Sequence, residues 1–285
     1  MRRSAAMLAV ALALAASSCW GVADFLGGLQ SRTLPVPVVI CVVEGTGLAL
    51  VLVVIAAAGE PVPGVRDSAL GVLAGVAGVI GLACFLRALA IGTMSIVAPI
   101  SATGVALPVV VGLATGDRLS TIVAIGVVVA VLGVVLASRE RHDDAERRAI
   151  GRSSIVLALA AAVGFGSYFA LADAAAGGGV WWLLALSRVV PVPVLALLAW
   201  QRGMRAPPRT RLFILMTAGT IDCSATGFYA LATTKGALSI VAVVGSLYPV
   251  VTVVLARTFL GERIRPVQQV GVAAALAGVA MIAAG

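Results

Sequence analysis

The chain alternates between long apolar stretches and short polar breaks. An α-helix needs about 20 apolar residues to cross a bilayer, and ten stretches of that length are bounded by charged residues, Pro or Gly. They lie at 7–28, 35–57, 68–90, 93–115, 120–138, 153–175, 180–200, 210–231, 237–259 and 266–284. The pattern predicts an all-α integral membrane protein with ten transmembrane helices. The stretches lack the alternation of a porin-like barrel.

The N-terminal stretch has two interpretations. Arg2 and Arg3 are followed by an apolar run and then by residues 16–19, Ala-Ser-Ser-Cys, which resemble a signal-peptide or lipoprotein cleavage site. The apolar run continues to Leu29, which is longer than a signal core, so we favour a first transmembrane helix.

Composition supports membrane insertion. The sequence is 61% hydrophobic and 11% charged, whereas soluble domains carry about 25% charged residues. The mean hydropathy is +1.13. These values exclude a soluble enzyme, a secreted disulfide scaffold and a disordered chain.

The net charge of +8 does not indicate nucleic-acid binding. Basic residues lie mostly at helix ends and in loops, where lipid head groups and the positive-inside rule account for them. None of the four Cys forms a CxxC pair, and the single His142 lies in a charged segment. We therefore expect no metal and no cofactor. The sequence contains no Walker loop, HExxH or Ser-His-Asp set, so we also expect no enzymatic activity.

The two halves of the chain resemble each other. Residues 95–98 recur at 239–242, 116–118 recur with one acid exchanged at 261–263, and both Gly126 and Gly133 have counterparts at a nearly constant offset. This repeat predicts one unit at 7–138 and a second at 153–284, joined by the charged segment 139–152. Since each unit has five helices, the second must enter the membrane from the opposite face, as in secondary transporters built from inverted repeats.

Several of these motifs resemble the EamA-type drug/metabolite transporter superfamily: Trp20-Gly21, residues 95–99 (SIVAP), Tyr248-Pro249, residues 260–263 (LGER) and the Gly271 to Gly278 stretch. The resemblance implies export or exchange of small metabolites such as amino acids, nucleosides or sugars, often linked to ion gradients. Two features depart from a symmetric pattern: Pro108 lies about one helical turn later than Pro249, and Asp117 stands where Glu is more usual.

Charged residues inside apolar spans are the best candidates for function, because a buried charge is costly in hydrocarbon. Glu44 and Arg188 occupy matching positions in the second helix of each repeat. We expect them to pair, or to bind the opposite charges of a zwitterionic substrate. A purely structural ion pair is the alternative.

Asp222 lies near the middle of the eighth span, with Thr226 and Tyr229 on the same helical face. This acid could bind an ammonium group or take up a proton, so protons are a candidate coupling ion. The alternative is a hydrogen bond between helices.

Trp20 and Asp24 share a face of the first helix and could bind a cation, or else lie at the membrane interface. The matching helix of the second half carries aromatic residues in place of the acid, so we expect an asymmetric site. The predicted substrate-binding residues are Trp20, Asp24, Glu44, Phe165, Tyr168, Arg188, Asp222, Tyr229, Ser246 and Tyr248.

Other features have structural interpretations. Gly71 with Gly75, and Gly112 with Gly116, are spaced for close helix packing, and the acids Asp117 and Glu262 are expected to cap the start of the next helix. Membrane orientation stays open, because the distribution of arginines favours both termini outside whereas the family resemblance implies both inside.

The sequence thus predicts a secondary active transporter of the plasma (inner) membrane. We expect it to export small metabolites such as amino acids or related compounds by alternating access. Two alternatives are a membrane-embedded enzyme that acts on lipid phosphates and a membrane subunit that transports nothing.

Overall fold

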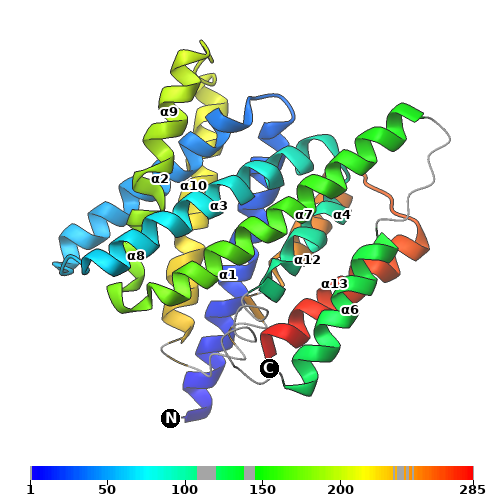
Figure 1. Cartoon of the computed structure of the whole chain (residues 1–285), viewed down its shortest axis with the longest axis horizontal. Coiled ribbons are helices and arrows are strands. Elements are labelled where there is room, and N and C mark those ends of the chain that lie inside the picture. Colours follow the sequence, from blue (N-terminus) through cyan, green and yellow to red (C-terminus); the bar gives the residue numbers. More distant parts are fainter. Residues whose placement is uncertain are drawn as a thin grey trace.

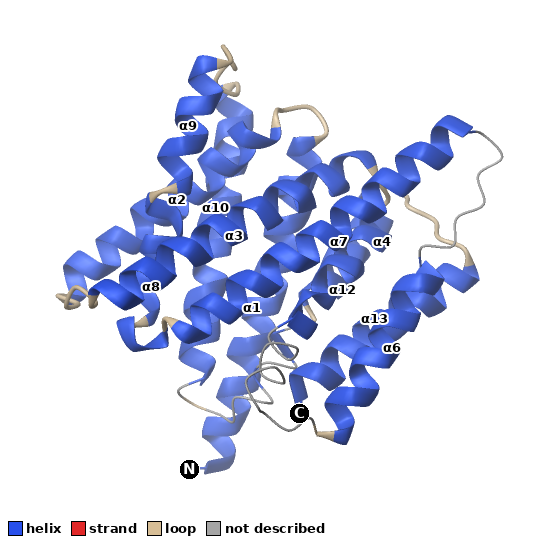
Figure 2. Ribbon diagram, in the orientation of Figure 1, coloured by secondary structure: helices blue, strands red, loops and turns tan. Residues whose placement is uncertain are grey.

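The computed structural model describes residues 2–107, 120–137, 145–233, 235, 241, 244–245 and 247–284, and within these residues it contains helices and no strand (Figure 1 and Figure 2). The first half comprises α1 (Arg2–Ser31), α2 (Val36–Ala58), α3 (Val65–Ile91), α4 (Met94–Ala102), η1 (Thr103–Val105) and α6 (Thr121–Ala137). The second half comprises α7 (Ala145–Ala174), η2 (Ala176–Gly178), α8 (Val180–Val189), α9 (Pro191–Gln201), α10 (Arg209–Thr233), α12 (Tyr248–Phe259) and α13 (Pro266–Ala284).

The helices are suited to a bilayer. Six segments of the described chain are long and apolar enough to cross it, namely α1, α2, α3, the span Gly151–Ala172 within α7, the span Val180–Gln201 and α10. Large apolar side chains such as Val128, Trp200 and Phe213 are exposed on the outside of the bundle, as expected where lipid replaces water. The chain is therefore an all-helical, multi-pass membrane protein, as the sequence predicts.

The seventh predicted span is broken rather than continuous. It consists of α8 and α9, with Val190 between them. Pro191 and Pro193 have no N–H to donate to the carbonyls of Ser187 and Val189, so the helical hydrogen-bond ladder is interrupted there. The break directly follows Arg188, which lies in the last turn of α8.

Two other predicted spans also differ from the structure. The sixth begins at Ala145, within the charged segment 139–152 that the sequence places between the two units. In the fourth, the α-helix α4 ends at Ala102 and is followed by the short 3₁₀ helix η1, and residues 108–115 of this span lie outside the described residues. Pro108 and Asp117 lie outside the described residues.

The two halves of the chain are interleaved. The most extensive helix contacts join α6 to α13, α3 to α7, and α1 to α10, and each of these pairs takes one helix from each half. Figure 1 shows α3 and α7 running side by side, and α6 beside α13 at one end of the bundle. Neither half is therefore packed as a separate domain.

The larger helix contacts between the halves are also symmetric: when each helix is replaced by its counterpart in the other half, the same set of contacts results. Exchanging the halves converts the α1–α10 contact into α7–α3, and the α1–α12 contact into α7–α4, and both members of each pair are present. The α2–α8 and α4–α12 contacts each join a helix to its own counterpart, so the exchange leaves them unchanged. This is the contact pattern expected of two similar repeats, whereas the unit boundaries at 138 and 153 stay a prediction.

Glu262 caps a helix, but not the one expected from the sequence. Instead of the next helix, α13, it caps α4 in the other half: its Oε1 accepts the N–H of Met94 at 3.0 Å and its Oε2 accepts that of Ser95 at 2.9 Å. Arg32 at the end of α1 lies 3.5 Å from the same carboxylate. An N-terminal turn has free N–H donors and a positive dipole end, so the acid stabilises it from any element that brings it close.

Small residues allow the close approach of α3 to α8. A Cβ atom on Gly75 would lie 2.1 Å from the carbonyl oxygen of Ser187, and one on Gly71 would lie 3.1 Å from Leu186. The predicted packing role of these two glycines is confirmed. Gly112 and Gly116 lie outside the described residues.

We expect Gly75→Ala to lower the free energy of unfolding by about 1–3 kcal/mol, the usual cost of overpacking, because the methyl group must push α3 away from α8. Unfolding in detergent micelles, followed by circular dichroism, measures this loss. Gly64→Ala is the matched control, since a Cβ there meets no atom within 4 Å. Equal stability of the two variants would contradict the predicted close contact.

Candidate functional site

Arg188 is held by the end of its own helix. Its Nη1 donates to the carbonyl oxygen of Leu184 at 3.1 Å and to the Ser187 hydroxyl at 3.5 Å. Only 9% of its side chain is exposed. The negative end of the α8 dipole also favours a cation at this position.

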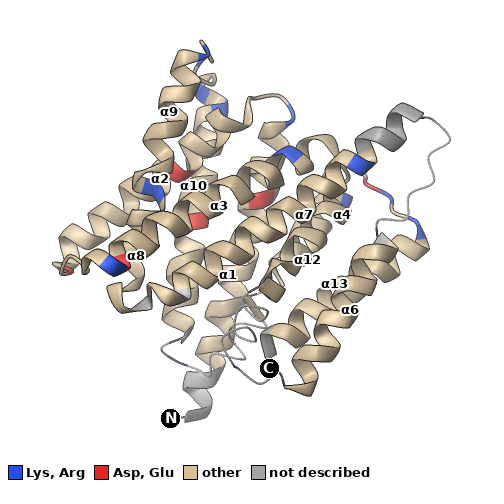
Figure 3. Ribbon diagram, viewed as in Figure 1, with Lys and Arg blue, Asp and Glu red and all other residues tan. Residues whose placement is uncertain are grey.

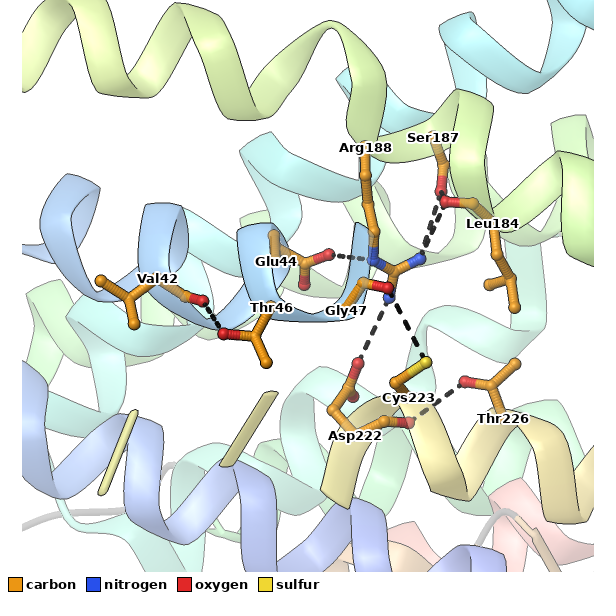
Figure 4. A network of polar contacts seen from close by, with 10 residues as sticks. All are labelled: Val42, Glu44, Thr46, Gly47, Leu184, Ser187, Arg188, Asp222, Cys223 and Thr226. Carbon is orange, nitrogen blue, oxygen red and sulfur yellow. Dashed lines mark hydrogen bonds and ion pairs between the residues drawn. The ribbon is translucent and has the colours of Figure 1, made fainter. Parts of the chain in front are cut away.

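Two carboxylates from two other helices complete the environment of this arginine (Figure 4). Glu44 on α2 places Oε2 2.7 Å from Arg188 Nε, and Asp222 on α10 places Oδ2 3.3 Å from Nη2. The Nε–H does not point at Glu44 closely enough for a hydrogen bond, so that contact is an ion pair by distance alone. The three side chains join α2, α8 and α10 in the middle of the protein.

Asp24 adds a third acid to this region. It lies on α1, close enough to Asp222 for their charges to repel each other, and within the described residues it forms no hydrogen bond or ion pair. Figure 3 shows acidic and basic positions close together in the middle of the bundle, away from the basic residues at the helix ends. With all groups ionised, three carboxylates lie in a region that holds one guanidinium, so the region carries surplus negative charge.

Aromatic rings lie beside Asp24. The Trp20 ring centroid is 5.5 Å from that of Tyr229 on α10 and 6.4 Å from that of Tyr248 on α12. Tyr248 lies close enough to Asp24 for electrostatic interaction. Tyr168 on α7 is close enough to Arg188, Glu44 and Asp222 to feel their charges.

The described residues contain no group of three His, Cys, Asp or Glu side chains placed to hold a metal ion. The arrangement instead offers charged and aromatic groups at the contact between the two halves. Such groups can bind a small polar solute in the middle of a membrane.

Comparison with known proteins agrees with this architecture. Residues 152–284 match the model of the EamA-like transporter family. The second half of the chain is therefore similar to EamA-like transporters. Members of that family are membrane transporters of small molecules rather than enzymes, so the resemblance expected from the sequence is confirmed.

A protein of known crystal structure shares the fold of this chain. The TM-score is 0.65 at 13% sequence identity, and the match covers 96% of each chain. At this identity the likeness shows a common fold and nothing about the substrate. A search of curated proteins finds no match.

The structure gathers most of the predicted site residues into two neighbouring groups. Glu44, Arg188 and Asp222 form an ionic group, with Tyr168 nearby, and Trp20, Tyr229 and Tyr248 form an aromatic group. Asp24 lies close to both groups. That these residues bind substrate stays a prediction.

Two predicted residues are not part of these groups. Phe165 packs 5.6 Å from Phe85, centroid to centroid, at the edge of the largest apolar core. Ser246 lies outside the described residues. Thr226 keeps its predicted place beside Asp222, but its hydroxyl donates to the Asp222 backbone carbonyl at 3.3 Å and not to the carboxylate.

Sequence reasoning missed the contact between Asp222 and Arg188 and the helix break that places this arginine. The Pro-Val-Pro sequence at 191–193 could have indicated the break. No local signal indicates the contact, because it depends on how α10 and α8 both pack against α2.

Proposed function

We propose that the chain is a secondary active transporter that exports small metabolites, such as amino acids or related compounds, across the plasma membrane by alternating access. The observation that carries the proposal is the ionic group at the contact between interleaved halves. In a membrane interior such charges are costly, and they usually mark a path for solutes or ions.

The symmetry of the helix contacts supports the alternating part of the proposal. If the halves at 7–138 and 153–284 are inverted repeats, they can exchange conformations, and one face closes as the other opens. Glu262 then ties α12 to α4 at one end of the molecule, and this contact has to separate when that end opens.

The test is a counterflow assay with purified full-length chain in lipid vesicles. Vesicles are preloaded with one unlabelled compound from a panel of amino acids and amines, and the labelled form is added outside. We expect at least one labelled compound to accumulate transiently against its own gradient, which requires a carrier that exchanges solutes. Protein-free vesicles are the control. Entry no faster than in that control for every compound would contradict the proposed function.

A further inference from the structure

With Asp24, Glu44 and Asp222 ionised, the middle of the protein has more negative than positive charge. Glu44 and Asp222 share the single guanidinium of Arg188. Asp24 adds a carboxylate that repels Asp222 and has no ion-pair partner among the described residues. Because uncompensated charge is costly in a low-dielectric interior, this region favours a ligand that brings positive charge.

The groups around Asp24 suit one kind of positive charge. Trp20 lies one helical turn before Asp24 on the same face of α1, and its ring packs near those of Tyr229 and Tyr248. Faces of Trp and Tyr attract ammonium groups, and more strongly where water is excluded. A carboxylate beside such rings therefore recognises a charged nitrogen together with its apolar substituents.

The Arg188 guanidinium already contacts protein groups through all three of its nitrogens. Its Nε faces Glu44, its Nη2 contacts Asp222, and its Nη1 donates to Leu184 and Ser187. A ligand carboxylate at this place would be repelled by Glu44 and Asp222, which lie against the guanidinium, and by Asp24 close to Asp222. This arrangement discriminates against zwitterions.

We propose that Asp24, together with Trp20, Tyr229 and Tyr248, binds the charged nitrogen of an organic amine that lacks a carboxylate. This inference rests on the proposed transport function and narrows its substrate class. The position on α1 beside α10 and α12 places the amine next to the ionic group, where it offsets the surplus negative charge.

The experiment compares two probes that differ by one carboxylate: phenethylamine and phenylalanine. Isothermal titration calorimetry on the full chain in detergent gives both dissociation constants. We expect phenethylamine to bind at least about tenfold more tightly, a difference of about 1.4 kcal/mol. Asp24→Asn and Trp20→Leu should each weaken phenethylamine binding by about tenfold or more, whereas the exposed Glu60→Gln should leave it unchanged.

Three results would overturn the inference: equal or tighter binding of phenylalanine, unchanged phenethylamine affinity in Asp24→Asn, or no binding of phenethylamine to the wild-type chain. Asp24→Asn removes a charge that has no described partner, so it should melt no lower than wild type, and a loss of binding is then not a loss of fold. The counterflow assay separates this outcome from failure of the proposed function. If an amino acid showed counterflow and phenethylamine did not bind, the proposed amine site would be contradicted, whereas the proposed transport function would be supported.

Discussion

Replacing Arg188 with methionine is expected to lower the free energy of unfolding by about 3–5 kcal/mol, the usual cost of removing one partner of a buried ion pair. The loss is large because Glu44 and Asp222 lie at 2.7 and 3.3 Å from the guanidinium and would be left without their cation. Unfolding of the purified chain in mixed micelles measures the effect.

Two further variants make this result interpretable. Arg202→Met removes an exposed arginine and should cost less than about 0.5 kcal/mol, as surface changes usually do. The triple variant Arg188→Met/Glu44→Gln/Asp222→Asn removes all three charges and should recover most of the lost stability. If the single Arg188 variant were as stable as Arg202→Met, the ion-pair account would be wrong.

In Asp222→Asn, transport driven by a pH gradient is expected to fall to the level seen without a gradient, while exchange in the absence of a gradient persists. Asparagine keeps the shape of the side chain but cannot take up a proton. Asp222 is the candidate because 25% of its side chain remains accessible although it contacts Arg188.

The assay is uptake into vesicles with and without an imposed pH gradient. Glu60→Gln removes an acid from an exposed position and is the matched control. Unchanged gradient-driven uptake in Asp222→Asn would exclude this residue as the proton carrier.

The sequence predicts the helical architecture well, because each span is specified locally. A run of about 20 apolar residues bounded by charge or Gly is sufficient to indicate a membrane helix. The repeat also places Glu44 and Arg188 at matching positions, which is why their proximity could be expected. In the structure the two side chains are in contact. They lie on α2 and α8, which occupy equivalent positions in the two halves and contact each other.

The remaining features depend on packing between helices far apart in the chain. Asp222 reaches Arg188 only because α10 packs beside α2, and Glu262 reaches Met94 and Ser95 only because α12 lies against α4. A periodic pattern shows which face of a helix is polar but not which helix it meets. For that reason the cap by Glu262 was assigned to the wrong helix.

The proposed transport requires that the group around Asp24 and Asp222 lies on the path of the solute. The most direct test is labelling of Asp24→Cys in a chain whose native Cys19, Cys41, Cys84 and Cys223 are replaced by alanine. The probe is a charged, membrane-impermeant thiosulfonate added to vesicles. Because this reagent reacts with thiolate in water, only a position that water reaches is modified.

We predict that the thiol at position 24 is modified, and that a thiol introduced by Val128→Cys on the lipid-facing surface of α6 is not. Excess of a solute that shows counterflow should slow the reaction at position 24. If position 24 stayed unmodified from both sides of the membrane while an exposed Glu60→Cys thiol reacted, the central group would not lie on a solute path.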